Sequence, residues 1–121
     1  MEPHHPSDIV PSCFDPFGRN VVATLGRWEE HIEGGHPEVD EHFAAAQSTV
    51  EAPEIVTADA KYQTRENFYR RGVLPPPFDR LYLKVCVAYG PGRVLGAFLI
   101  GQVVTAYPTR TIGRGEAQRW P

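Results

Sequence analysis

The sequence lacks the features that mark several large classes of protein. No window reaches the ~18 apolar residues that a membrane-spanning helix needs, and glycines and Gln102 interrupt the longest apolar run, Val94–Val104. The N-terminus, MEPHHPSD, has neither a basic n-region nor an apolar h-region, so no secretion signal is expected. A Gly-rich phosphate loop, a C-x-x-C pair and a G-x-S-x-G elbow are also missing. The chain therefore carries no membrane segment and none of these enzyme motifs.

Positive charge is scarce as well. The formal net charge is -3, whereas nucleic-acid-binding proteins usually carry a basic face. A local cluster matters more than the sum, however, because the field at a surface depends on the charges nearby. The clearest local group of cations contains Arg65, Arg70, Arg71, Arg80 and Lys84.

Cysteine is represented by only Cys13 and Cys86. Cys86 lies within an apolar run, where a cysteine behaves as a small buried hydrophobe. This favours reduced thiols and a cytoplasmic protein. His4 and His5 are adjacent, but a histidine pair in a proline-rich arm is weak evidence for a metal site. We therefore expect no bound metal and no cofactor.

The length of 121 residues fits one domain with one core. Apolar residues make up 41% of the chain and charged residues 22%, values that are ordinary for a globular protein. Four prolines prevent a helix in Met1–Arg19. We therefore expect residues 1–19 to form an irregular arm and residues 20–121 to form a single domain.

Two helices are predicted in the N-terminal half, after a short edge strand at Val21–Thr24. Thr24 is a suitable N-cap for a first helix from about Leu25 to Glu33. The second helix opens at His36-Pro37-Glu38, where His36 is the N-cap and proline suits the first helical position. It must end before Pro53. Its apolar stripe consists of Val39, Phe43, Ala46 and Val50.

Alternating apolar residues predict about four strands in the C-terminal part. Glu54–Ala60 and Asn67–Arg71 give the first two. Leu81–Tyr107 gives a β-hairpin that turns at Gly90-Pro91-Gly92. Trp120, at the end of a polar tail, is expected to fold back on an edge of the core. Helices followed by strands predict an α+β fold, with two N-terminal helices packed on a roughly four-stranded antiparallel sheet.

Seven polar residues, Tyr69 and Tyr107 among them, interrupt this apolar pattern, and the other five form the candidate site. They are His31, His36, Arg71, Lys84 and Thr105. Metal-free cleavage of RNA by its own 2′-OH needs a base, a cation and a proton donor. Neutral histidine is a good base near pH 7, and arginine or lysine stabilises charge on phosphoryl oxygens. The residue types therefore fit a metal-independent endoribonuclease.

The strand alternation suggests how part of this site is brought together. Tyr69 with Arg71, and Thr105 with Tyr107, are expected to share one face of the sheet. Each candidate also has a purely structural interpretation. His31 is then a histidine at the rim of a packed helix and His36 a helix cap, while Arg71 belongs to a solvated strand face. Lys84 would extend to solvent, and Thr105 would be a good strand former.

Several segments in a fixed order resemble a known family. They are RWEEHIEGGHPE (27–38), EAPEIVTAD (51–59), FYRR (68–71), YLKVCV (82–87) and VVTAY (103–107). This pattern, which spans about Val21–Trp120, resembles the PBECR family of small prophage and bacterial proteins. That family is grouped with the barnase–EndoU–colicin–RelE-like (BECR) nucleases. The W-x-x-H-I-x-x-x-H-P-E motif followed by a late T-A-Y is its most specific part.

The resemblance implies a BECR-like fold of two helices followed by a four-stranded antiparallel sheet. It also implies a metal-independent endoribonuclease that acts as a toxin or effector on cellular RNA, with RNA as substrate and an immunity or antitoxin protein as a partner to test for. The residues that match its motifs are the same five: His31, His36, Arg71, Lys84 and Thr105.

Two other functions fit the sequence. One is a non-catalytic module of the same fold that binds RNA or protein, for which alanine substitutions would weaken association without any turnover to lose. The other is a structural protein that uses an exposed sheet edge to form a homodimer. Neither hypothesis involves a membrane.

Overall fold

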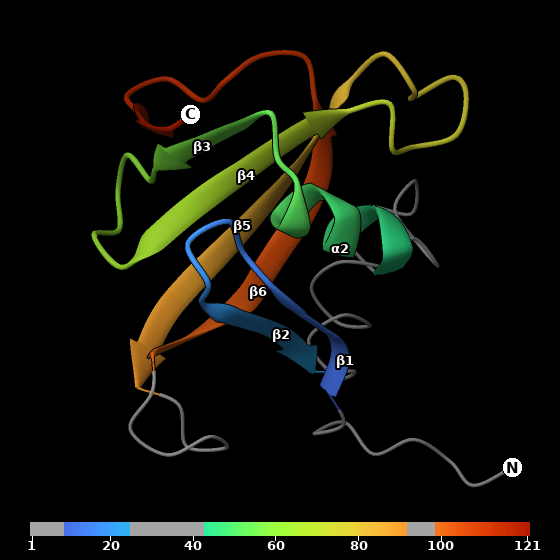
Figure 1. The fold of residues 1–121 in the computed structure, drawn as a ribbon. Coiled ribbons are helices and arrows are strands. Elements are labelled where there is room, and N and C mark those ends of the chain that lie inside the picture. The colour runs from blue at the N-terminus through green and yellow to red at the C-terminus, as the bar shows by residue number, and fades with distance from the viewer. Residues whose placement is uncertain (1–8, 25–42, 92–98) are drawn as a thin grey trace, which may run out of the picture.

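A curled β-sheet forms most of the described part of the protein (Figure 1). The structure is a computed structural model, and it describes residues 9–24, 43–91 and 99–121. Within these residues the sheet has seven strands, in the order β1-β2-β6-β5-β4-β3-β7. Strands β2 and β6 run parallel, and every other neighbouring pair is antiparallel. The strands are β1 (Ile9–Phe14), β2 (Asn20–Thr24), β3 (Ile55–Ala58), β4 (Arg65–Arg71), β5 (Tyr82–Pro91), β6 (Leu99–Thr109) and β7 (Ala117–Trp120).

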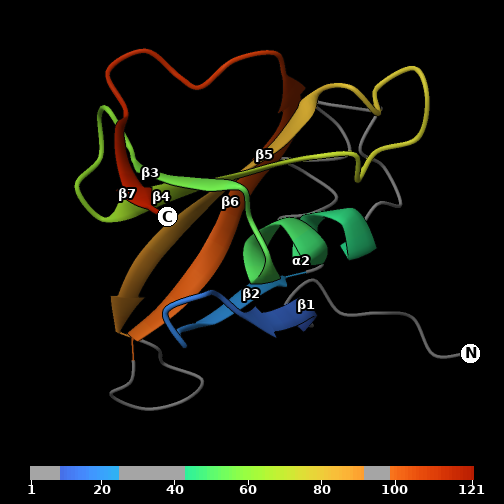
Figure 2. The same cartoon turned by 45° about the horizontal axis from the view of Figure 1, so that its top comes forward.

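One helix in the described residues, α2 (Phe43–Glu51), packs inside the curl of the sheet (Figure 2). It contacts β1 at one edge and also β4 and β5 near the middle, which requires the sheet to bend around it. Ala46 and Val50 are four residues apart and both buried, so they lie on one helical face. The helix ends just before Pro53, because the residue before a proline disfavours helical geometry. We call the face covered by α2 the inner face and the opposite one the outer face.

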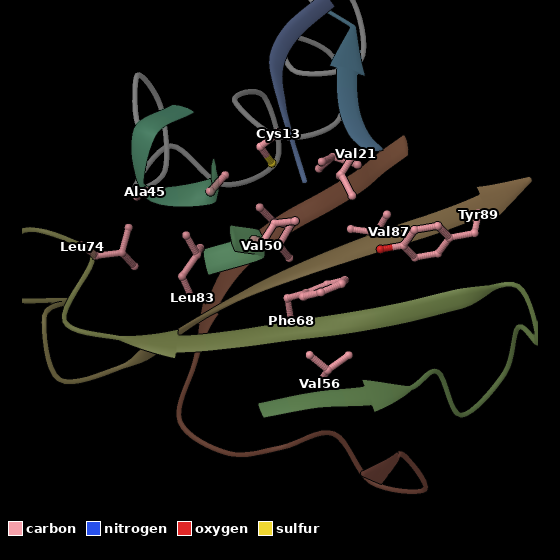
Figure 3. Close-up of a cluster of buried hydrophobic side chains, with 14 residues drawn as sticks. Cys13, Val21, Ala45, Val50, Val56, Phe68, Leu74, Leu83, Val87 and Tyr89 are labelled. Atoms are coloured by element: carbon pink, nitrogen blue, oxygen red, sulfur yellow. The ribbon is translucent and has the colours of Figure 1, made fainter. Parts of the chain in front are cut away.

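The hydrophobic core fills the space between α2 and the inner face (Figure 3). Phe68, Val85 and Val87 are fully buried on the central strands β4 and β5. Burial of each such side chain contributes about 1.5–3 kcal/mol. Gly101 on β6 makes room for this packing, because a Cβ there would collide with the side chains of Val87 and Tyr89. The core therefore fixes the central strands, and with them the side chains on the outer face.

The predicted α+β fold, with two N-terminal helices on a four-stranded antiparallel sheet, is wrong. The described residues form a mostly β structure with a seven-stranded mixed sheet and a single helix. Residues 9–14 form strand β1 instead of an irregular arm. Pro11 is tolerated because β1 is an edge strand whose register shifts between Ile9 and Ser12. Strand β7 escaped prediction because its side chains are mostly exposed and show no apolar alternation.

Several predicted elements are confirmed. Strands β3 and β4 match the two predicted segments, and β5 and β6 form the predicted antiparallel pair. The second helix is confirmed over Phe43–Glu51. Trp120 packs against the core as predicted, from the edge strand β7. Strand β5 continues through Gly90 and Pro91, which pair with β6, so these two residues are not in the turn.

Other predictions lie outside the described residues, including the first helix at about Leu25–Glu33 and the start of the second. Cys13 and Cys86 are both buried, and no disulfide joins them. In the part of the chain that the structure describes, no helix is long and apolar enough to cross a bilayer.

Candidate functional site

Polar and aromatic side chains form a row across the middle of the outer face. Tyr69 on β4 pairs with Lys84 on β5, and Lys84 pairs with Tyr107 on β6. Directly paired residues project from the same face of a sheet, and their sequence neighbours project from the other. The neighbours Phe68 and Leu83 are buried in the core. The row Tyr69–Lys84–Tyr107 therefore points away from α2.

Glu116 reaches this row from the C-terminal segment, which we define as Thr109–Pro121. Its Oε2 accepts a hydrogen bond from Lys84 Nζ at 2.7 Å. Its Oε1 accepts hydrogen bonds from the hydroxyls of Tyr69 and Thr57, each at 2.5 Å. The side chains of Glu116 and Lys84 are only 4% and 12% exposed. We call these four residues (Thr57, Tyr69, Lys84 and Glu116) the Glu116 cluster.

The cluster holds each group in a defined protonation state at neutral pH. Burial alone would raise the pKa of Glu116, but the hydrogen bonds from Lys84, Thr57 and Tyr69 outweigh it and hold the pKa below its usual value. Burial would lower the pKa of Lys84, and the bond to Glu116 instead keeps it well above its usual range. Burial and the Glu116 carboxylate raise the pKa of Tyr69 to about 12. The cluster is therefore a carboxylate, an ammonium and a neutral phenol.

The C-terminal segment is fitted closely to the outer face at Gly113. The Gly113 N–H donates to Tyr69 Oη at 3.2 Å. A Cβ at Gly113 would collide with the Glu116 carboxylate and come within 3.2 Å of Lys84 Nζ. A larger residue at position 113 would therefore displace the Glu116 carboxylate from the cluster.

The structure places three of the five predicted site residues on the outer face. Lys84 belongs to the Glu116 cluster. Thr105 pairs with Cys86 in the next row of the sheet, and Arg71 pairs with Tyr82 in the row on the other side. The Arg71 side chain is 57% exposed and forms a salt bridge of 2.9 Å with Glu54. His31 and His36 lie outside the described residues.

Sequence reasoning missed the centre of this arrangement. Glu116 and Thr57 were not among the predicted site residues, and Tyr69 was expected only to share a face with Arg71. Glu116 lies far along the chain from Lys84, and no periodic pattern connects them. The available signal was that Glu116 is the only acidic residue in Thr109–Pro121, a segment that also contains three arginines.

The charged residues of the C-terminal segment are three arginines and one glutamate. All three arginines, Arg110, Arg114 and Arg119, are exposed. The one acid of that segment, Glu116, points inward and is paired with Lys84. The charged side chains that this segment presents to the solvent are therefore all positive.

Metal-binding residues do not gather in the described part of the protein, which has no group of three or more His, Cys, Asp or Glu able to hold an ion. No protein-family model, curated protein or solved structure matches the chain. The resemblance to the PBECR family therefore stays a prediction, and the functional argument rests on the geometry of the protein itself.

Proposed function

We propose that this protein binds single-stranded RNA along the C-terminal segment and the adjoining outer face of the sheet. The observation that carries the proposal is the outward charge of that segment. Arg110, Arg114 and Arg119 are exposed, and none has an ion-pair partner among the described residues. Arginine is well suited to phosphate, because its planar guanidinium donates two parallel hydrogen bonds.

Aromatic side chains on the outer face supply the second requirement for binding single strands. Bases of single-stranded RNA stack on aromatic rings whatever their sequence. The Tyr82 ring lies 5.0 Å from the Arg71 guanidinium, and the Tyr107 ring lies 5.5 Å from Lys84 Nζ. Both tyrosines are partly exposed. Cations beside partly exposed rings are the combination that single-strand-binding surfaces use.

The proposal is tested by the fluorescence anisotropy of a labelled RNA of about 10 nucleotides, within the roughly 4–16 nucleotides that one such fold covers. Binding should weaken steeply as the salt concentration rises. Each phosphate contact should contribute about 0.7 to the steepness of the slope of log K against log salt. Arg114→Ala should reduce this slope by about that amount.

Arg70→Ala is the matched control, because it removes the same charge from the inner face. The Arg70 guanidinium donates to the carbonyl of Ala52, just after the end of α2. Arg70→Ala should therefore leave the slope of log K against log salt unchanged. Equal effects of the two substitutions, or no binding at low salt, would contradict the proposal.

A second candidate function is metal-independent RNA cleavage by attack of the 2′-OH. It is favoured by Arg71 and Lys84, two cations in adjacent rows of the outer face, because cations of this kind stabilise charge on a phosphate. His31 and His36 remain the alternative bases, with Arg71 and Lys84 as phosphate ligands and Thr105 beside them. The reaction forms a 2′,3′-cyclic phosphate and releases the 5′-OH of the next nucleotide.

Incubation of the RNA with the protein in EDTA tests this second function. Cleavage is expected for RNA and not for the 2′-O-methyl RNA of the same sequence, which lacks the nucleophile. His31→Ala or His36→Ala should slow cleavage by about 10²–10⁴-fold if that histidine transfers the proton. If RNA stays intact, the protein binds RNA without cleaving it. The same conclusion follows if both histidine variants and Glu116→Gln cleave RNA at the same rate as the wild-type protein.

The proposal also assigns the protein to the cytoplasm. Both cysteines are buried and free. Unbridged cysteines are typical of the reducing cytoplasm, where RNA ligands are abundant. Alkylation of the denatured protein, isolated under conditions that trap thiols, should modify both residues.

A further inference from the structure

An open pocket of about 330 Å³ lies where the turn between β1 and β2 meets β4 and β7. Its lining residues are Phe17, Arg19, Glu66 and Arg119. The volume is at the lower end of the range for small-ligand sites. The pocket is separate from the Glu116 cluster, with which it shares no residue.

The turn that presents Phe17 is held rigidly. Asp15 Oδ1 accepts hydrogen bonds from the backbone N–H groups of Phe17 and Arg19, both at 2.9 Å. Gly18 adopts a φ of 81°, a conformation that suits glycine. The Phe17 ring is nevertheless 47% exposed. An apolar ring held out to solvent on a fixed turn is preorganised for binding a flat partner.

Arg19 and Glu66 form the polar wall of the pocket. Arg19 Nε donates a hydrogen bond to Asp15 Oδ2 at 2.7 Å, and Arg19 Nη2 donates one to Glu66 Oε1 at 2.6 Å. The guanidinium carbon lies 3.8 Å from the centre of the Tyr89 ring and 4.9 Å from that of Phe17. Glu66 Oε2 accepts only a long hydrogen bond of 3.4 Å, from Arg19 Nη1. Glu66 therefore keeps acceptor capacity for a donor in the pocket.

Arg119 supplies the cation of the pocket. Two carboxylates, Asp15 and Glu66, already neutralise Arg19. Arg119 is exposed and has no ion-pair partner among the described residues. It is also the last arginine of the C-terminal segment, so a strand that follows this segment arrives at the pocket.

We propose that the pocket receives one base of the bound RNA and selects bases that carry an exocyclic amino group. The base stacks on Phe17, its amino group donates to Glu66 Oε2, and its phosphate pairs with Arg119. Adenine, guanine and cytosine have such a donor, whereas uracil has in its place a carbonyl oxygen, which the carboxylate repels, and keeps only its ring N3–H as a donor. This inference rests on the proposed RNA binding and adds a base preference to it.

Oligo-cytidine and oligo-uridine of equal length form the test, because the two bases differ only on this edge: cytosine has an amino group beside the acceptor N3, and uracil has a carbonyl beside N3–H. Anisotropy should show that oligo-cytidine binds about 10-fold more tightly than oligo-uridine. This ratio corresponds to the free energy of about one hydrogen bond to a charged group. Glu66→Gln should bring the ratio close to one, because an amide accepts from cytosine and donates to uracil.

Phe17→Ala should weaken the binding of both oligonucleotides by about 5- to 150-fold, the range that corresponds to the loss of one stacked base. Phe14→Ala is the matched control: Phe14 is 62% exposed on the neighbouring strand and does not line the pocket, so it should change neither affinity. Thermal unfolding of each variant confirms that it is folded.

The outcomes separate this inference from the proposed function. If neither oligonucleotide binds the wild-type protein at low salt, RNA binding itself is wrong. If both bind with equal affinity, RNA binding stands and the base pocket is wrong, whatever the variants do. A cytidine preference that survives Glu66→Gln would also overturn the assignment of Glu66.

Discussion

The described part of the protein has two ionic networks, the Glu116 cluster and the network behind the pocket. They consist of the same kinds of group but have different roles. In the Glu116 cluster, three hydroxyl and ammonium donors saturate a carboxylate that is 4% exposed. In the network behind the pocket, Asp15 is the saturated carboxylate, with four donors from Phe17, Arg19 and Tyr89. Only the second network has a further carboxylate, Glu66, that is half satisfied and faces a pocket.

The comparison separates two roles: the saturated carboxylates position the backbone, and the incompletely satisfied Glu66 is the one that we propose binds a ligand. Glu116 fastens the C-terminal segment to the outer face, and Asp15 fastens the turn that presents Phe17. Buried polar groups are costly when they lose a partner. Substitutions at the two anchors should therefore change stability, and substitutions at Glu66 or the exposed arginines should change binding.

Removal of the Glu116 anchor should have the largest effect. Glu116→Ala leaves the ammonium of Lys84 and the hydroxyl of Tyr69 without their acceptor. We expect a loss of about 3–5 kcal/mol in the free energy of unfolding, the usual cost of breaking a buried ion pair on one side. Urea denaturation measures it.

Glu54→Ala is the control for that prediction, since Glu54 pairs with Arg71 at the surface. An exposed pair contributes only about 0–1 kcal/mol. If the two variants lose the same stability, Glu116 does not act as an anchor.

The second anchor is weakened by Tyr89→Phe. This change removes the hydroxyl that donates to Asp15 Oδ2 at 2.8 Å and keeps the buried ring. A hydrogen bond to a charged group contributes about 1.5–3 kcal/mol, and urea denaturation should show a loss in that range. Tyr62→Phe, at an exposed ring in the turn between β3 and β4, should be neutral. Equal stability of both variants would contradict the anchor role of Asp15.

Gly113→Ala tests how closely the C-terminal segment fits the outer face. The added methyl group would collide with the Glu116 carboxylate, and overpacking of this kind usually costs about 1–3 kcal/mol. Gly90→Ala is the comparison, because nothing lies within 4 Å of a Cβ there. Thermal unfolding should show a lower midpoint for the first variant only. A midpoint unchanged by Gly113→Ala would mean that the segment is held elsewhere.

The smallest effect concerns pH. The pKa of Glu116 is depressed below its ordinary 4.5 in the folded protein, so its contribution to stability is present above pH 4.5 and is lost as the pH falls through the folded value. The pKa of Tyr69 is raised from 10.0 to about 12, so its contribution is present below pH 10 and is lost as the pH rises towards 12. Glu116→Gln should flatten the acid side of a plot of stability against pH. An unchanged acid limb would contradict the depressed pKa.

The sequence predicted the elements that have their own hydrophobic signal. Strands β3 to β6 alternate because one face is buried, and that alternation also predicted that Arg71 and Thr105 share a face, on which the structure also places Lys84. Strands β1 and β7 lie at the edges, where backbone pairing suffices and side chains carry no signal. Without them the fold class was wrong. Glu116 and the Phe17 pocket were missed because both depend on contacts between distant parts of the chain.

The salt dependence of RNA binding tests the central claim most directly. The comparison is between the wild-type protein and the triple variant Arg110→Ala, Arg114→Ala, Arg119→Ala. The account predicts that the triple variant loses about 2 from the slope of log K against log salt, since each phosphate contact contributes about 0.7. A slope that stays at the wild-type value would show that the C-terminal segment does not hold RNA.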